Sequence, residues 1–561
     1  MKRRVAAAVA IGLLALPQAA SAHAVLEASS PSRGASIAHA PARVTLRFDE
    51  PVEIAFGAVR VYDAKGGRVD SGPASHPSGR GESVTVDLRH GLGDGTYTAT
   101  YRVISADSHP VSGGFTFTVG AGGSAPTAGV ADLIDAGAAG PVTEVAFGAV
   151  RALSYLAIAL LAGGLAFALA VWRPASAGPT ATAAFDGSGR SVGLAAATLG
   201  VACSALGLVL QGATAGATSF WAALDPTVVG DVLGTRFGTV WGLRLCAFAL
   251  FGSTLGLRLR STHDIALLPL AAFLCLTPAL AGHASTVDPR ALLVPANFVH
   301  VSAMSIWVGG VATLLVVVPR ATRTLEPPDR TPLLAETVSR FSTIALFSVA
   351  ALVASGIAQA IPELESLADF TSTAFGRALL AKIALLVALL ALAAWNRRRA
   401  RPRLAALAQR RDAPGETGVL LRRSLRAELA LMLAVLGVTA ALVSYPPPSA
   451  ARGPFSGQSE LGPARMELTL DPARPGANEL HMYLFRRSSG AQYDRVKELR
   501  VSASLPDKRI GPLQLRAEKA GPGHYLVRRA QLAPAGTWRL TIDARVSEFD
   551  AYRAELEVPV K

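Results

Sequence analysis

The sequence predicts a multidomain membrane protein in which two all-β sandwich domains flank a bundle of about eight transmembrane helices. Apolar residues make up 51% of the 561 residues and charged residues only 17%, whereas soluble domains carry about 25% charged residues. Stretches near both ends alternate between apolar and polar residues, as half-buried strands do. The middle of the chain instead holds long apolar stretches. These observations exclude a disordered chain, a fibrous chain and a wholly soluble enzyme.

Residues 1–22 have the pattern of a secretory signal peptide. A basic start is followed by a short apolar run and by the small residues Ala20-Ser21-Ala22, which form an A-x-A cleavage site. Cleavage after Ala22 makes His23 the N-terminal residue of the mature protein. Its α-amine and its ring Nδ1 can then chelate one metal ion, and such nitrogen ligands suit Cu(II).

The first β-sandwich is predicted over residues 23–120, and a Gly- and Ala-rich linker follows at 121–141. Clusters of Gly, Pro, Ser and Asp separate the alternating runs, as expected of an exported sandwich domain. The predicted strands lie at 44–48, 59–62, 84–88, 97–103 and 115–119.

Residues 142–446 contain about eight apolar stretches, each close to or above the ~20 residues that cross a bilayer. Arginines gather in the loops after the odd-numbered stretches, as in the run from Arg397 to Arg426. The positive-inside rule therefore places both ends of the bundle outside the cytoplasm. The same loops account for much of the net charge of +14, so nucleic-acid binding is not needed to explain it. The stretches lie near 152–172, 191–211, 237–257, 264–282, 292–318, 341–361, 375–395 and 427–445.

Residues 451–561 alternate again and predict a second extracytoplasmic β-sandwich. His481, Met482 and His524 lie in this region without a spacing that pairs them as metal ligands, so structural roles are predicted for them.

Asp107 and His109 are separated by one residue, between two predicted strands. Alternate side chains of an extended segment point the same way, so both can face one ion. Together with His23 they supply nitrogen and oxygen ligands of the kind that Cu(II) takes in a tetragonal site, with Ni(II) and Zn(II) as alternatives.

Two histidines fall in the predicted membrane region. His283 lies at the outer end of the fourth stretch and His300 lies inside the fifth. His300, Met304 and Trp307 follow at i, i+4 and i+7 and share a helix face. A histidine and a methionine at similar depth suit copper, especially Cu(I), and ionisable groups inside a membrane are functional candidates. A hydrogen-bonding role for His300 and a packing role for Met304 are the alternatives.

Three further polar residues lie in this region. Asn297 stands one turn before His300. Arg244 and Lys382 lie inside predicted spans, and we expect them to pair with acids such as Asp231 or Glu144 or to bind backbone carbonyls.

Residues 23–120 resemble the CopC domain of bacterial copper-handling proteins. The resemblance rests on His23 after the A-x-A site, on SSPSRGA at 29–35, on LRFDEPV at 46–52 and on SADSHPVSGGFTFTV at 105–119. It implies Cu(II) binding by His23, Asp107 and His109, with Glu50 nearby; Asp49 and Glu53 are alternative acids. No methionine occurs in residues 23–120, so a thioether Cu(I) site is not expected there.

The membrane region resembles CopD, through AGHAS at 281–285, HVSAMSIWVGG at 300–310 and FGRALLAKIAL at 375–385. The resemblance implies an acidic residue one turn before His300 in some relatives, so a carboxylate ligand is missing at Asn297. The last region resembles the YtkA-like domain, mainly over 521–542. The order of these regions matches CopC–CopD fusion proteins, which handle copper in bacterial copper homeostasis and resistance.

The resemblance implies a protein that binds copper and transports it across the cytoplasmic membrane, with import as the expected direction. Cu(II) is expected at the N-terminal domain and Cu(I) in the membrane domain. Copper ions, the lipid bilayer and extracytoplasmic copper donor proteins are the expected partners, without nucleic acid and without enzymatic activity. A haem-binding redox protein, a copper sensor or sequestration protein without transport, and an oxidative copper enzyme are the alternatives.

Overall fold

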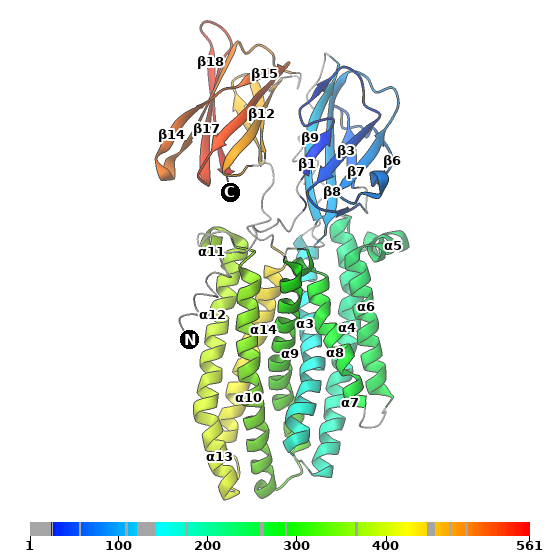
Figure 1. Ribbon diagram of the computed structural model, residues 1–561, viewed down its shortest axis with the longest axis vertical. Coiled ribbons are helices and arrows are strands. Elements are labelled where there is room, and N and C mark those ends of the chain that lie inside the picture. Colours follow the sequence, from blue (N-terminus) through cyan, green and yellow to red (C-terminus); the bar gives the residue numbers. More distant parts are fainter. Residues whose placement is uncertain are drawn as a thin grey trace. The chain divides into compact units, whose positions relative to one another are not determined.

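The structure is a computed structural model (Figure 1), which describes residues 24, 26–54, 58–106, 110–120, 141–175, 178–216, 218–257, 263–286, 289–364, 369–445, 455–471, 473–488 and 492–560. The predicted signal peptide, almost all of the predicted linker, and the three predicted Cu(II) ligands His23, Asp107 and His109 lie outside these residues.

The N-terminal region is a β-sandwich, as predicted. One sheet has the strand order β1-β3-β7-β6 and the other has the order β2-β9-β8-β4, with β5 also paired to β8. The strands are β1 (Leu26–Ser30), β2 (Ser36–Ile37), β3 (Arg43–Phe48), β4 (Val52–Glu53), β5 (Val59–Tyr62), β6 (Asp70–Ser75), β7 (Ser83–Leu88), β8 (Gly95–Ser105) and β9 (Pro110–Val119).

Alternation explains why these residues form a sandwich. Val44, Leu46 and Phe48 of β3 are almost fully buried, while Arg43 and Arg47 on the other face of the strand are exposed. Each strand therefore gives one apolar face to the shared core, and burying that face is what favours the two-layer arrangement.

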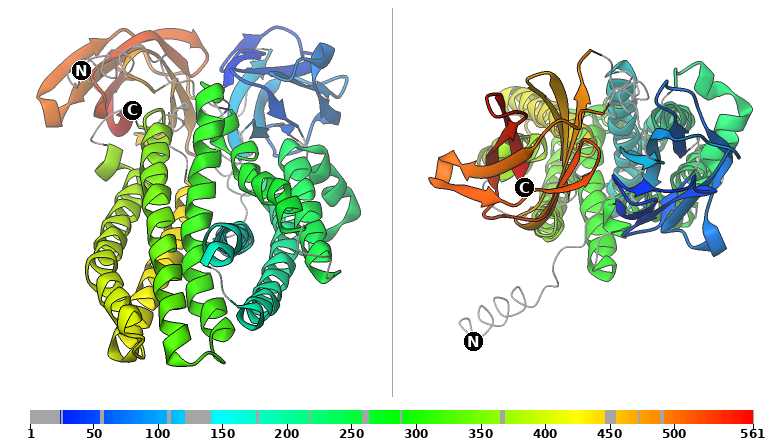
Figure 2. Two further views of the ribbon diagram at one scale, coloured as in Figure 1. Left: turned by 60° about the horizontal axis from the view of Figure 1, so that its bottom comes forward. Right: turned by 90° about the horizontal axis from the view of Figure 1, so that it is seen from above.

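The middle of the chain is helical, and its long helices lie side by side (Figures 1 and 2). Among the described residues, seven helices are long and apolar enough to cross a membrane. The helices are α3 (Pro141–Phe167), α4 (Pro179–Ala215), α5 (Pro226–Gly234), α6 (Arg236–Gly256), α7 (His263–Ala266), α8 (Leu268–Leu280), α9 (Arg290–Ala321), α10 (Pro327–Ala360), α11 (Asp369–Ser372), α12 (Ala374–Trp395), α13 (Arg401–Arg410) and α14 (Gly415–Leu442).

The fourth predicted stretch differs from the other seven. The structure divides it into α7 and α8, and α8 has only 13 residues, with Pro278 inside it. At 1.5 Å per residue, a helix of this length reaches about 20 Å, less than the ~30 Å of a bilayer core. The chain then turns through the short 3-10 helix η5 (His283–Ser285). In the described part of the chain the bundle thus has seven helices long and apolar enough to span a membrane and one shorter apolar helix, close to the predicted number.

Helices α3 and α9 approach each other at two glycines. A Cβ added at Gly309 would lie 2.8 Å from the Cα of Gly163 and would collide with the carbonyl oxygen of Ala159. A Cβ at Gly163 would likewise collide with the carbonyl oxygen of Ser305. Small residues allow this kind of backbone contact between membrane helices, so glycine is required at both positions.

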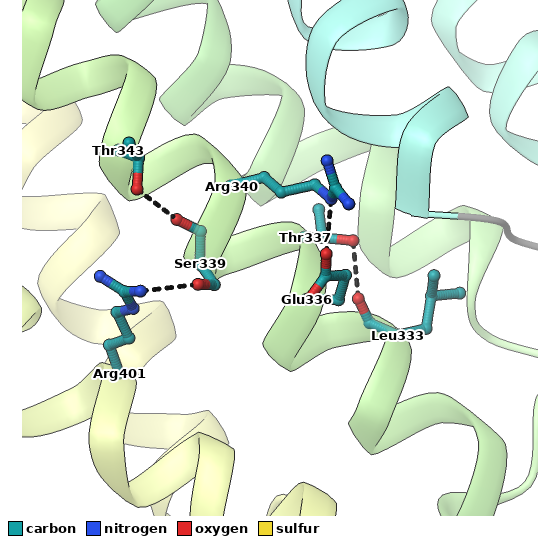
Figure 3. A network of polar contacts seen from close by, with 7 residues as sticks. All are labelled: Leu333, Glu336, Thr337, Ser339, Arg340, Thr343 and Arg401. Atoms are coloured by element: carbon teal, nitrogen blue, oxygen red, sulfur yellow. Dashed lines mark hydrogen bonds and ion pairs between the residues drawn. The ribbon is translucent and has the colours of Figure 1, made fainter.

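At the arginine-rich end of the bundle, α10 and α13 are joined by polar contacts (Figure 3). The Arg401 guanidinium donates to Ser339 Oγ at 2.8 Å, and Arg340 pairs with Glu336 one turn earlier on α10. These contacts give hydrogen-bond and ion-pair partners to polar side chains at the end of the bundle that carries most of its basic residues.

The C-terminal region is a second β-sandwich, as predicted. Its sheets have the orders β10-β11-β12-β16-β15 and β14-β13-β17-β18. Strict alternation in β11 buries Met466, Leu468 and Leu470, and Trp538 fills the core from the other sheet. The strands are β10 (Phe455–Leu461), β11 (Ala464–Asp471), β12 (Gly476–Arg486), β13 (Glu498–Leu505), β14 (Ile510–Leu515), β15 (Glu518–Gly521), β16 (His524–Leu532), β17 (Gly536–Arg545) and β18 (Ala551–Val560).

Candidate metal sites

The predicted Cu(II) site belongs to the N-terminal sandwich. Its ligands His23, Asp107 and His109 lie outside the described residues, so their roles stay predictions. Ala24, the residue after His23, is buried in the sandwich core. The connection that contains Asp107 and His109 joins β8 to β9, two strands that pair up to Ile104 and Pro110.

Glu50 is the predicted nearby acid that the structure does describe. Its Oε1 accepts a hydrogen bond at 3.3 Å from the backbone N–H of Ala106, the residue immediately before Asp107. Glu50 therefore holds the start of the segment that carries two predicted ligands. This contact favours a positioning role for Glu50.

We expect Glu50→Gln to weaken Cu(II) binding by no more than about tenfold, because loss of an outer partner of a metal site costs ~10–100-fold and the amide oxygen still accepts the Ala106 hydrogen bond. A competition titration with Cu(II) measures the change. A loss above a hundredfold would instead identify the Glu50 carboxylate as a direct ligand.

In the bundle, His300 of α9 points toward α10. Its Nδ1 lies 3.1 Å from the carbonyl oxygen of Leu352 and 3.1 Å from Ser355 Oγ. The carbonyl can only accept, so Nδ1 carries the proton and Nε2 keeps its lone pair. A histidine held through one ring nitrogen is oriented to bind a metal through the other.

Asn297 lies beside His300 in a small polar network. Its Nδ2 donates to Gln359 Oε1 at 2.7 Å, and Gln359 Nε2 donates to the carbonyl oxygen of Ser355. The Oδ1 of Asn297 is buried without a hydrogen-bond partner in the described part of the chain. This amide oxygen is an uncharged candidate metal ligand at the position where the sequence suggested a missing carboxylate.

A carboxylate from another segment joins this region through electrostatic interactions. Glu363, in the turn after α10, interacts electrostatically with His283 and with Lys382 of α12. Burial raises the pKa of the Glu363 carboxyl, and the charges of His283 and Lys382 oppose this effect. The positive charge of Lys382 also interacts electrostatically with the imidazole ring of His300. His283, His300, Asn297, Glu363 and Lys382 therefore form one polar cluster, which we call the outer cluster.

Two predictions about the other membrane residues change. Lys382 interacts with Glu363 rather than with Asp231 or Glu144. Arg244 is almost fully buried, and its Nε donates to Thr277 Oγ1 at 2.8 Å while its guanidinium stacks 4.5 Å from the Trp241 ring. A hydroxyl and an aromatic face thus take the place of the expected acid or backbone carbonyl.

Met304 packs against two apolar clusters of the bundle, one of which also contains Trp307. This contact accounts for its packing role, and metal binding by Met304 stays a prediction. Trp307 is buried and lies on the wall of a cavity farther along the bundle.

That cavity has a volume of about 720 Å³. It reaches from Trp307 and Phe341 to Arg397, Arg398 and Arg401. Glu428 of α14 also lines it; this carboxylate is buried and accepts a 2.5 Å hydrogen bond from Asn396 Nδ2. The bundle therefore holds polar groups on both sides of Trp307. We call this space the inner cavity.

The fold and these groups define a class: a multipass membrane protein that carries β-sandwich domains and a histidine-containing polar cluster inside its bundle. Family profiles match three segments of the chain. They are the CopC domain at residues 26–120, the copper resistance protein D-like N-terminal domain at 142–289, and copper resistance protein D at 335–442.

The copper transport protein CutJ of Bacillus subtilis is 32% identical over 491 residues, which cover 83% of this chain and 82% of that protein. The chain therefore belongs to the copper-protein family in which CopC and CopD domains are fused in one polypeptide. Copper resistance protein C of Pseudomonas syringae is 37% identical over 105 residues, or 18% of this chain and 82% of that protein.

Among solved structures, CopC from Methylosinus trichosporium OB3b is 34% identical and covers 17% of this chain and 93% of its own, with a TM-score of 0.16. PcoC from Escherichia coli, a methionine-rich copper resistance protein, is 30% identical and covers 18% and 99%, with a TM-score of 0.16. The YtkA-like character of residues 451–561 stays a prediction.

Proposed function

We propose that this protein captures Cu(II) at its N-terminal β-sandwich and moves copper inward across the cytoplasmic membrane through the helix bundle. Binding and transport of copper follow from the family to which the chain belongs. The site residues, the direction and the oxidation states are the parts that we propose. The observation that carries the proposal is the outer cluster, in which Leu352 and Ser355 hold the Nδ1 of His300 so that its Nε2 keeps a lone pair.

The capture step uses His23, Asp107 and His109, whose nitrogen and oxygen atoms suit Cu(II). Glu50 supports this step because it holds the residue before Asp107 through the Ala106 hydrogen bond. Extracytoplasmic donor proteins are the proposed source of the ion.

The crossing step uses the outer cluster first and the inner cavity second. His283 and His300 supply imidazole nitrogens, and Asn297 supplies a buried oxygen. The Glu363 carboxylate offsets the positive charge of Lys382, which would otherwise repel an incoming cation. Trp307, two turns after His300 on α9, lines the cavity that Glu428 also lines, so we take this cavity as the next stage of the path.

Inward movement agrees with the charge distribution. The positive-inside rule favours a cytoplasmic position for the arginine-rich loops, and Arg397, Arg398 and Arg401 also line the inner cavity. When a cation enters the negatively charged cytoplasm, its free energy falls by about 2.3 kcal/mol per charge for each ~100 mV of membrane potential. The potential can therefore drive entry without ATP.

The test is intracellular copper over time in cells that express the wild type or the His283→Ala/His300→Ala variant. We expect the wild type to raise copper above the empty-vector level and the variant to fall back to that level. His90→Ala removes an exposed imidazole of the N-terminal sandwich and serves as the matched control.

Lower copper in cells with the wild type would reverse the proposed direction. Equal copper in wild-type and variant cells, with equal amounts of protein in the membrane, would remove the outer cluster from the path.

A further inference from the structure

The C-terminal sandwich brings together two histidines that lie 43 residues apart in the sequence. His481 is on β12 and His524 is on β16, and these strands pair so that His524 stands opposite Tyr483. His481 lies two residues along on the same face of the sheet. The Nδ1 of His481 and the Nε2 of His524 are 3.2 Å apart. The sequence-based assignment of unrelated structural roles missed this pair.

The pair does not belong to the apolar core of its domain. Leu480, Met482 and Leu484 point into that core, and because side chains alternate along a strand, His481 points to the opposite face. Both imidazoles are nevertheless buried, with 8% of His481 and 6% of His524 exposed. The Tyr483 ring stacks on His524 with ring centres 4.4 Å apart.

Both rings are buried, and burial disfavours the protonated, charged form of an imidazole. The neutral ring has one lone pair, and metal ions bind to that form of histidine. The facing nitrogens either share one proton or share a metal ion.

The hydrogen bond between the two nitrogens aims their lone pairs along one line. Two-coordinate Cu(I) takes the same linear arrangement at about 2 Å from each nitrogen, so the two rings need to separate by less than about 1 Å to admit the ion. Glu479 Oε2 lies 3.7 Å from His481 Nε2. A carboxylate there favours the tautomer with the proton on Nε2, which leaves Nδ1 as the metal-binding atom, a common arrangement around bound metals.

The number of donors selects the kind of ion. No group of three or more His, Cys, Asp or Glu side chains in the described residues is arranged to hold a metal. Cu(II) and Zn(II) take four or more ligands, whereas Cu(I) is stable with two nitrogen ligands. Each ring keeps one N–H away from the ion, so binding releases no net proton.

We propose that His481 and His524 form a second copper site, in the C-terminal β-sandwich, that takes Cu(I) between two imidazole nitrogens. The choice of copper rests on the proposed function, while the paired nitrogens rest on the strand register alone. The C-terminal sandwich would then bind reduced copper, Cu(I), whereas the N-terminal sandwich of the same protein captures Cu(II).

The test uses the full-length protein, titrated with Cu(I) under anaerobic conditions against the chelator bicinchoninate. We expect His481→Gln/His524→Gln to bind one equivalent less than the wild type. Glutamine retains a hydrogen-bonding amide, so the strands can still be bridged. His39→Gln/His90→Gln removes two exposed imidazoles and should leave the stoichiometry unchanged. If the double variant fails to fold, single His481→Gln should weaken this equivalent at least tenfold.

Equal Cu(I) binding by the wild type and the double variant would overturn the inference. If the double variant binds one Zn(II) equivalent less than the wild type but the same amount of Cu(I), the choice of copper would be overturned. These results are separate from those for the proposed function, because that function depends on His283, His300 and the N-terminal ligands. A protein that imports copper without binding Cu(I) at His481 and His524 would refute this inference alone.

Discussion

His23→Ala is expected to weaken Cu(II) binding at least a hundredfold. The substitution leaves the α-amine in place after cleavage but removes the imidazole, so the chelate that both groups form with one ion is lost. Loss of an outer partner of a metal site already costs ~10–100-fold, and loss of a direct ligand costs more. A Cu(II) competition titration of the full-length protein measures the difference.

His90→Ala is the control for this experiment, because His90 is an exposed histidine of the same sandwich. It should leave Cu(II) affinity unchanged. If His23→Ala binds Cu(II) as tightly as the wild type, the N-terminal residue is not a ligand. The same result would follow from an uncleaved leader, which N-terminal sequencing of the purified protein would reveal.

The second large effect concerns Gly309. We expect Gly309→Val to abolish most of the folded protein, because the new side chain would meet the backbone of α3 at Ala159 and Gly163. Overpacking usually costs about 1–3 kcal/mol, and here the obstacle is a backbone that no rotamer change can move. The helix that would be displaced carries His300. Fluorescence-detected size-exclusion and thermal unfolding in detergent measure the loss.

Gly437→Val offers a matched control on α14. A Cβ at Gly437 would meet no atom within 4 Å, and the same loss of glycine in a helix is involved. This variant should fold and transport copper as the wild type does. Comparable damage from both substitutions would mean that valine is poorly tolerated anywhere in the bundle, and the α3–α9 contact would lose its special role.

Much of the fold was predictable because it depends on local patterns. Alternation in segments such as Val44–Phe48 identifies strands whatever their partners, and long apolar stretches identify spanning helices. The fourth stretch was the exception. Its apolar composition resembled the others, but its helix is divided before Leu268 and ends at Leu280, which hydropathy alone does not reveal.

The sites were less predictable, since they depend on contacts between distant segments. His481 and His524 meet only because β12 pairs with β16 in one particular register. Glu363 lies in a turn, outside any motif, and joins the outer cluster through its electrostatic interactions with His283 and Lys382. His300 was predictable because it is an ionisable residue within an apolar stretch.

The π-helical turn η6 (Asn396–Ala400) joins the apolar helix α12 to the arginine-containing helix α13 and so changes the direction in which their side chains point. A π turn accommodates one residue more than an α turn, so it shifts the rotational phase of everything after it by about 100°. The apolar side of α12 and the arginines of α13 can thus face different directions along a single axis. Deleting one residue there would realign the two halves and carry Arg401 away from Ser339, its partner on α10.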